Sequence, residues 1–418
     1  MIEHMFDPWD SERKALEREF RRCTFSGVPQ QPPSMTLAGL FAGIGGIERG
    51  LSRHGAEPQL LCEYWDPARA VLGEHFPDIP LVGDVRELRS LPKVDVVGAG
   101  FPCTDLSQAG RTKGIEGNES SLVGEIFRLL RRRRAPVLLL ENVRNMLVLD
   151  GGRAMRYLVD EIESLGYRWA YRVVDSRFTG VPQRRQRVIL VAARELDPRS
   201  VLLADDVGEP DDDWYEDEAF GFYWTEGLRG LGWAKDAVPP LKGGSSIGIP
   251  SPPAIWNPSA PVGRRLIVPD ISEAELLQGF PADWTEPARR ASAHKGARWK
   301  LVGNAVTVGV GEWVGSRLAE PGLPIVEGEP LGQGDAWPTA CWGAKGKAWK
   351  SNVSMWPLRL PYTHLTQMVD LSSAPPLSTK AAAGFLKRAQ SGNLRFVPGF
   401  LDDVESHVMI HEGSRAIA

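Results

Sequence analysis

Between residues 35 and 194, short apolar runs alternate with amphipathic segments, and this alternation restricts the fold more than any other feature of the chain. The apolar runs include MTLAGLF, PQLLCEY, VDVVGAG, PVLLLENV and RVILVAAR, and helical patterns such as residues 120–134 and 153–165 lie between them. Short strands that alternate with helices are typical of a mostly parallel sheet covered on both faces. We therefore predict an α/β fold with a doubly wound, mostly parallel sheet.

The alternation stops near residue 195, where the sequence becomes acidic and then rich in Gly, Pro and Trp. Periodicity returns in ISEAELLQGF and NAVTVGVGEWVGSRL, which we predict as helices with Ser272 and Asn304 as N-caps. We predict a charged helix with a proline-rich linker (1–33), followed by the main α/β domain (34–195). An irregular subdomain (196–263), a return to the main domain (264–320) and a C-terminal extension (321–418) follow.

Composition narrows the class of protein. The 418 residues are 42% hydrophobic, enough for one large domain and a smaller one. No apolar run reaches the roughly 18 residues that a membrane span needs, and the charged N-terminal stretch does not resemble a secretory signal. The net charge of −4 argues against wholesale coating of nucleic acid, although a local basic face remains compatible with DNA binding.

The cysteines Cys23, Cys62, Cys103 and Cys341 are widely spaced. No CxxC pair suggests zinc, and their density is too low for a disulfide scaffold. A reducing, cytoplasmic setting fits best, and we predict no metal site.

A glycine cluster, LFAGIGGIERG at 40–50, directly follows the first predicted strand. A strand, a glycine turn and a helix N-terminus together form a site for a polar cofactor, because the backbone approaches closely where no Cβ intervenes. The cluster is not the dinucleotide fingerprint, since Glu48 stands where GxGxxG requires its third glycine. The alternative is that the glycines only form a tight turn.

Polar and aromatic residues after the next two strands extend this site. Glu63 is placed to accept hydrogen bonds from ribose hydroxyls, Tyr64 or Trp65 to cover an adenine face, and Asp84 to accept from an adenine amino group. These side chains favour a positively charged nucleoside over a phosphorylated one.

The apolar run 94–100 ends in Gly-Phe-Pro and is followed by Cys103 in a polar loop. In open α/β sheets, ligands bind at the carboxyl ends of the strands. A thiolate there is a strong nucleophile, so Cys103 is a candidate catalytic residue. The other three cysteines are expected to be packing residues or inert thiols.

Charged residues lie at the ends of two further predicted strands. Glu141 closes the strand PVLLLENV, where it could share a cleft with Cys103 or simply favour a helix N-terminus. Arg185 and Arg187 alternate at the start of RVILVAAR, where they could contact a base carbonyl or phosphates or form a solvated edge.

The segments FAGIGG, FPCTDLSQAG, ENV, QRRQR, ELLQGFP and GNAV occur in this order between about residues 36 and 318. In this order and spacing they resemble the DNA (cytosine-5)-methyltransferases, of the bacterial type found in restriction-modification systems. The resemblance implies the S-adenosylmethionine-dependent methyltransferase fold. It also implies methyl transfer from S-adenosylmethionine to carbon 5 of a flipped-out cytosine in a specific duplex sequence, through a covalent cysteine adduct.

The resemblance assigns roles residue by residue. Cys103 would be the nucleophile, Glu141 would hold the ring nitrogen beside the exocyclic amine, and Arg185 and Arg187 would bind the base carbonyl and orient the loop. The implied cofactor contacts are Phe41, Gly43, Ile44, Gly46, Glu63, Tyr64 or Trp65, Asp84, Val85, Pro102, Leu122, Asn304 and Val306.

The resemblance also implies partners. Residues 196–263 would form a target-recognition region for double-stranded DNA, with LKGGSSIGIPSPPAIW as its better candidate because the first half is acidic. A monomer is expected, in the cytoplasm of a bacterium or encoded by a phage, beside a companion endonuclease that acts separately. The C-terminal tryptophans are expected to be packing residues rather than DNA contacts.

Two alternatives remain open at this stage. A branch with the same fold methylates cytosine in tRNA, although the Cys-Phe-Thr signature of that branch is missing here. A non-catalytic DNA-binding homologue is disfavoured because Cys103, Glu141, Arg185 and Arg187 are all present.

Overall fold

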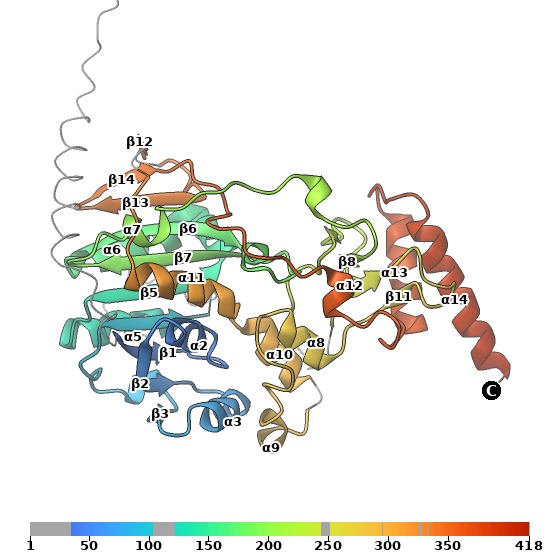
Figure 1. The fold of residues 1–418 in the computed structure, drawn as a ribbon, viewed down its shortest axis with the longest axis horizontal. Coiled ribbons are helices and arrows are strands. Elements are labelled where there is room, and N and C mark those ends of the chain that lie inside the picture. The colour runs from blue at the N-terminus through green and yellow to red at the C-terminus, as the bar shows by residue number, and fades with distance from the viewer. Residues whose placement is uncertain are drawn as a thin grey trace, which may run out of the picture.

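The computed structural model places a large sheet with its helices beside a smaller sheet (Figure 1). It describes residues 35–102, 122–243, 251–294, 296–325, 328–332 and 334–417. The N-terminal helix and linker predicted for residues 1–33 lie outside this range. Among the described helices, none combines the length and apolar character that crossing a membrane requires.

The described residues form a main sheet with the strand order β12-β14-β13-β6-β7-β5-β4-β1-β2-β3. The strands are β1 Met35–Leu40, β2 Ala56–Cys62, β3 Leu81–Val82, β4 Val96–Gly100, β5 Val137–Val143, β6 Arg168–Asp175, β7 Gln186–Ala193, β12 Glu329–Pro330, β13 Ala340–Ala344 and β14 Lys347–Lys350. Strands β5, β4, β1, β2 and β3 are parallel, and β7 inserts antiparallel between β5 and β6. The predicted doubly wound α/β fold is confirmed.

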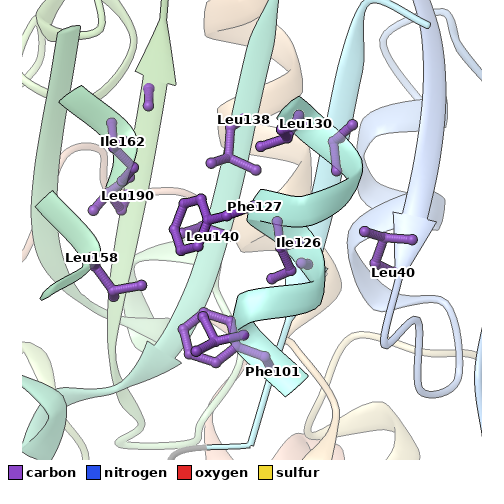
Figure 2. Close-up of a cluster of buried hydrophobic side chains, with 14 of the residues drawn as sticks. Leu40, Phe101, Ile126, Phe127, Leu130, Leu138, Leu140, Leu158, Ile162 and Leu190 are labelled. Atoms are coloured by element: carbon purple, nitrogen blue, oxygen red, sulfur yellow. The ribbon is translucent and has the colours of Figure 1, made fainter. Parts of the chain in front are cut away.

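Helices cover both faces of this sheet because its strand residues are apolar on both sides. Helices α5 Leu122–Arg132 and α6 Arg153–Ser164 pack on one face through side chains such as Phe127 and Leu158, as Figure 2 shows. Helices α2 Gly46–Ser52, α7 Arg199–Leu202 and α11 Val308–Ala319 pack on the other. Along β5, Leu138 and Leu140 face the first layer, and Leu139 faces the second.

Two glycines let α2 and α11 pack backbone against backbone. A Cβ on Gly50 would lie 2.6 Å from the carbonyl oxygen of Val308, and one on Gly311 would lie 3.2 Å from the Cα of Gly50. Side chains at these positions would push the helices apart. The close contact brings residues 304–306, which directly precede α11, against the glycine turn after β1.

Both predicted N-caps are wrong. Helix α8, Ile271–Leu276, begins after Asp270, whose side chain accepts from the backbone N–H of Glu273 while the Glu273 side chain accepts from that of Asp270. This reciprocal pair satisfies two free donors at once. Asn304 instead ends helix α10, Ala297–Asn304, and Thr307 precedes α11.

A smaller antiparallel sheet has the order β11-β10-β8-β9. Its strands are β8 Phe220–Phe222, β9 Ala234–Lys235, β10 Ala254–Trp256 and β11 Leu266–Ile267. The C-terminal helices α13 Thr379–Ser391 and α14 Phe400–Ile417 pack on it through Phe385 and Phe400, whose rings meet Phe222. Figure 1 shows these two helices on the side of the smaller sheet that lies away from the main sheet.

Helices α3 Asp66–His75, α8, α9 Ala288–Ala291 and α10 lie below and between the two sheets in Figure 1. The C-terminal part also extends the main sheet, because β13 pairs antiparallel with β6 and β14 pairs with β13. The rings of Trp342 and Trp349 stack 4.5 Å apart in this extension. Trp337 and Trp356 are also buried, as expected of packing residues.

Candidate active site

A cavity of about 580 Å³ lies at the carboxyl edge of the main sheet. Residues that follow β1, β2, β3 and β4 line it, because parallel strands end at the same edge. The strand order reverses between β1 and β4, and ligands of open α/β sheets bind at such a reversal.

The structure brings all the predicted cofactor residues to this edge. The main cavity is lined by Phe41, Gly43, Glu63, Tyr64, Trp65, Asp84, Val85, Pro102, Leu122 and Asn304. Ile44, Gly46 and Val306 line a space of about 30 Å³ that shares Phe41, Gly43 and Asn304 with the main cavity. The predicted cofactor residues therefore surround two adjoining spaces.

The glycine turn needs its glycines. Gly43 and Gly45 have φ angles of 57° and 85°, in the left-handed region that other residues avoid. A Cβ on Gly46 would collide with the carbonyl oxygen of Val306. The turn is tight, as the alternative interpretation held, and it also forms part of the cavity wall.

The Glu63 carboxylate is held in place by two backbone donors. Its Oε2 accepts from the N–H of Gly43 at 2.9 Å, and its Oε1 accepts from the N–H of Trp65 at 2.8 Å. Burial raises the pKa of Glu63, and these N–H groups oppose that rise. A carboxylate has about four acceptor positions, so Glu63 retains capacity for hydroxyl groups in the cavity.

Asp84 carries a second carboxylate on the cavity wall. Its hydrogen bonds with the Arg86 side chain, at 3.0 Å from Nε, lower its pKa. Asp84 is therefore ionised at neutral pH.

Sequence reasoning missed Lys300, which also lines the cavity. Its ammonium lies 4.7 Å from the centroid of the Trp65 ring. The signal was present, because Lys300 precedes Asn304 by one helical turn of α10. Tyr64 is 74% exposed, whereas Trp65 is half-buried.

Glu141 lies beside the cavity on the neighbouring strand. It pairs in register with Gly100 of β4, and a Cβ on Gly100 would lie 3.4 Å from Glu141 Oε2. Arg187 Nε lies 3.0 Å from Glu141 Oε1. Burial raises the pKa of the Glu141 carboxyl, and the positive charges of Arg187 and Arg185 oppose that rise.

Arg185 has a different environment from Arg187. It is 1% exposed, and its guanidinium donates to the carbonyl oxygens of Ala305 at 2.8 Å, Gly303 at 3.1 Å and Leu241 at 3.4 Å. These bonds join the start of β7 to the end of α10 and to the segment after β9. Arg187 therefore contacts Glu141, whereas Arg185 hydrogen-bonds to the backbone of the neighbouring segments.

Cys103, the predicted nucleophile, lies outside the described residues. It directly follows Pro102, which lines the cavity. The carbonyl oxygen of Phe101 accepts from the Asn142 side chain at 3.0 Å, which fixes the chain where it leaves β4. Cys62 and Cys341 are buried thiols whose pKa values burial raises, in Cys62 to about 12, as expected of inert thiols.

The arrangement combines two functions at one edge. Glu63 and Asp84 supply carboxylate acceptors to a large cavity that Arg86 and Lys300 also line, which suits a nucleoside with hydroxyl and amino donors. Next to it, Glu141 is a buried carboxyl held by an arginine, which suits proton exchange with a planar polar ring.

Comparisons with known proteins agree on one family. The family model described as C-5 cytosine-specific DNA methylase matches residues 35–222. The Type II methyltransferase M2.BsuMI of Bacillus subtilis (strain 168) is 44% identical over 385 residues, which cover 89% of this chain and 97% of that protein. The Type II methyltransferase M.MspI of Moraxella sp is 27% identical and covers 65% of this chain and 67% of its own length.

Among solved structures, a Spodoptera frugiperda DNMT2 variant aligns with a TM-score of 0.47 at 14% identity. The alignment covers 68% of this chain and 98% of that one.

Proposed function

The chain belongs to the C-5 cytosine-specific DNA methylase family, and from this premise we propose how its own residues carry out methyl transfer to DNA. The enzyme is a DNA (cytosine-5)-methyltransferase, and S-adenosyl-L-methionine is its methyl donor. The proposal is that the target cytosine is flipped out of a specific duplex sequence and reacts at carbon 5 through a covalent adduct with Cys103.

The residues of the cavity fit this cofactor. Glu63, already oriented by Gly43 and Trp65, accepts hydrogen bonds from the ribose hydroxyls. Asp84 accepts from the adenine amino group, and Tyr64 or Trp65 covers the adenine face. When bound, the cofactor would supply a methyl group on a positively charged sulfur.

The pairing of Glu141 with Arg187 is the observation that carries the proposal. The Cys103 thiolate adds to carbon 6 of cytosine, and the electron pair of the 5,6 double bond shifts through carbons 5 and 4 onto the ring nitrogen beside the exocyclic amine. Glu141 gives its proton to the ring nitrogen beside the exocyclic amine, which makes carbon 5 a nucleophile. The raised pKa of Glu141 favours the protonated form that this step requires.

The remaining steps transfer the methyl group and then release Cys103. Carbon 5 would take the methyl group as the sulfur–methyl bond breaks and its electron pair stays on sulfur, which leaves a neutral thioether. Carbon 5 then loses its proton to a base. The carbon–sulfur bond breaks, Cys103 leaves as a thiolate, and the ring-nitrogen proton returns to Glu141. Arg187 holds the base carbonyl, and Arg185 acts as a positioning residue because its donors are already used by Leu241, Gly303 and Ala305.

The burial of Glu141, which is 7% exposed, supports base flipping, because a base stacked in a duplex would not reach it. We therefore propose that the enzyme takes the cytosine out of the helix before reaction.

The test compares the wild-type enzyme with Glu141→Gln in labelled methyl transfer to duplex DNA and to tRNA. We expect transfer to duplex DNA, and about 10²–10⁴-fold slower transfer by Glu141→Gln at unchanged S-adenosylmethionine affinity, the usual effect of losing a proton-transfer group. An unchanged rate would remove Glu141 from the mechanism. Transfer to tRNA alone would instead support the RNA alternative.

The proposal extends to the biological setting. Residues 196–263 would supply target recognition, the enzyme would act as a monomer, and methylation would protect DNA from a companion endonuclease. The name Type II methyltransferase of the relative that matches most of the chain supports the restriction-modification setting. Digestion of DNA from expressing cells with a panel of type II endonucleases tests this: protection against one specificity is expected, and cleavage by all of them contradicts it.

A further inference from the structure

The turn of residues 224–230 lies between β8 and β9 of the smaller sheet, and its residues 228 and 229 are exposed. The N–H of Tyr223 donates to Leu231 at its base, and the N–H of Gly227 donates to Gly230 near its tip. Leu228 is 47% exposed and Arg229 is exposed beside it. The tip therefore presents a large apolar side chain and a guanidinium together.

One side of this turn is connected to the residues around Glu141, Arg185 and Arg187, which we call the base site. Lys242 lies 2.8 Å from Glu226 of the turn, and its ammonium lies 3.4 Å from the centroid of the Tyr223 ring. The preceding residue, Leu241, accepts from Arg185 and donates its N–H to Gln183 at 3.0 Å. Two contacts, joined by the peptide bond between Leu241 and Lys242, therefore connect the turn to Arg185.

Lys242 also changes the charge that the turn presents. Because it neutralises Glu226, the exposed charge at the tip is the positive one of Arg229. A negatively charged duplex that approaches the base site would meet that charge.

The other side of the turn is held by the C-terminal helix α13. Arg388 donates to the carbonyl oxygens of Glu226 at 2.9 Å and Trp224 at 2.6 Å. A Cβ on Gly392, just after α13, would lie 2.8 Å from the carbonyl oxygen of Leu228. The turn and the end of the helix are thus packed backbone against backbone.

The helix is itself fixed to the smaller sheet by the rest of the C-terminal segment. Asp403 of α14 accepts from Trp256 at 2.8 Å and from Arg265 at 2.6 Å. Leu377, shortly before α13, donates its N–H to Leu266 of β11.

The beginning of the C-terminal segment also contacts the smaller sheet, through Asp236 next to β9. Asp236 is fully buried, and its carboxylate accepts from the N–H of Leu365 at 2.8 Å and contacts His364 Nδ1 at 2.6 Å. The C-terminal segment from residue 362 onward therefore packs with the smaller sheet, although almost 100 residues separate it from β11 in the sequence.

We propose that the turn 224–230 is a DNA-reading element, with Arg229 and Leu228 as its contacts, and that Arg388 of the C-terminal segment positions it beside the base site. The recognition module would then consist of two separate chain segments, residues 196–263 and the C-terminal segment from residue 362. This inference rests on the proposed function, because it assigns the readout of the same methylated duplex.

The chemistry favours a base-edge contact. An arginine on an exposed turn can donate two hydrogen bonds to the O6 and N7 atoms of guanine in the major groove, and an apolar side chain can contact a thymine methyl group. Loss of one such arginine contact lowers discrimination by about 1–3 kcal/mol, which corresponds to roughly 5- to 150-fold.

The experiment uses the full-length wild-type enzyme and four variants: Arg229→Ala, Arg388→Ala, Arg388→Lys and Lys380→Ala. Lys380 is exposed in the first turn of the same helix, so its variant controls for the loss of one positive charge. For each protein we would measure KM and kcat for duplex DNA, the affinity for S-adenosylmethionine and the set of methylated sequences.

We expect Arg229→Ala and Arg388→Ala to raise KM for the target duplex roughly 5- to 150-fold and to methylate sequences that differ from the target at one base pair. Affinity for S-adenosylmethionine should stay unchanged, Arg388→Lys should restore part of the selectivity, and Lys380→Ala should match the wild type. If Arg388→Ala fails to fold, the exposed Arg229→Ala and the conservative Arg388→Lys still provide the test.

Unchanged selectivity in Arg229→Ala would overturn the inference while leaving the proposed function intact. A loss in Lys380→Ala equal to that in Arg388→Ala would also overturn it, because charge alone would then explain the effect. No methylation of DNA by the wild-type enzyme would overturn the proposed function and this inference together.

Discussion

Burial of the Glu48 carboxyl should make the stability of this enzyme fall as pH rises. Glu48 lies in the first turn of α2, is 1% exposed, and its Oε2 atom has no hydrogen-bond partner among the described residues. Gly39 leaves the space that its carboxyl occupies, since a Cβ there would collide with Oε1. Burial raises the pKa of Glu48 from 4.5 to about 7, and the nearby Glu63 adds to that rise.

The sign follows from proton binding in the two states. Between pH 4.5 and about 7, the folded protein keeps a proton on Glu48 that the unfolded chain has released. Stability therefore falls as pH rises through this window and then levels off. The difference between 4.5 and about 7, at ~1.4 kcal/mol per pH unit, corresponds to a loss of about 3 kcal/mol above pH 7.

Glu48→Gln keeps the shape of the side chain and removes its titration. Compared with the wild type, it should gain up to about 3 kcal/mol in free energy of unfolding between pH 5 and pH 8. Urea unfolding of both cofactor-free proteins at the two pH values measures this gain, with the exposed Glu57→Gln as control for the lost charge. An equal difference between Glu48→Gln and the wild type at both pH values would refute the reasoning.

Three other substitutions test the cofactor site and the packing around it. Glu63→Gln should weaken S-adenosylmethionine binding about 10-fold or more by titration calorimetry, since a charged acceptor is lost, and unchanged affinity would contradict its role. Gly46→Ala should lower both the urea midpoint and cofactor affinity, because its Cβ would collide with Val306; wild-type values for both would contradict the close approach. Arg298→Met should cost about 3–5 kcal/mol of stability, because the fully buried Glu275 loses its cationic partner at 2.9 Å and keeps only the donors of Thr285, and adding Glu275→Gln should recover much of that loss.

The main sheet and the location of the site were predictable because their signals lie within short stretches of sequence. Each of the first strands is a short apolar run followed by a polar or glycine-rich turn. Strands β1, β2 and β4 and the residues at their ends can therefore be recognised from their own sequence. Parallel strands then bring Phe41, Glu63 and Pro102 together regardless of their separation in the chain.

The features that were missed depend on contacts between distant segments. Strand β13 forms because it pairs with β6, about 170 residues earlier, and β14 forms because it pairs with β13. The runs ACWGA and KAWK show no strong periodicity of their own. The strands of the smaller sheet are two or three residues long, too short for a pattern. The backbone partners of Arg185 are likewise invisible in QRRQR.

The central claim is tested most directly by mapping methylcytosine at single-base resolution in DNA from cells that express the wild-type protein or Cys103→Ala. We predict 5-methylcytosine confined to one short sequence in the wild-type cells and none above background with Cys103→Ala. Equal methylation by the variant would contradict the covalent mechanism. The absence of new methylcytosine with a soluble wild-type protein that binds S-adenosylmethionine would contradict the assignment of DNA as the substrate.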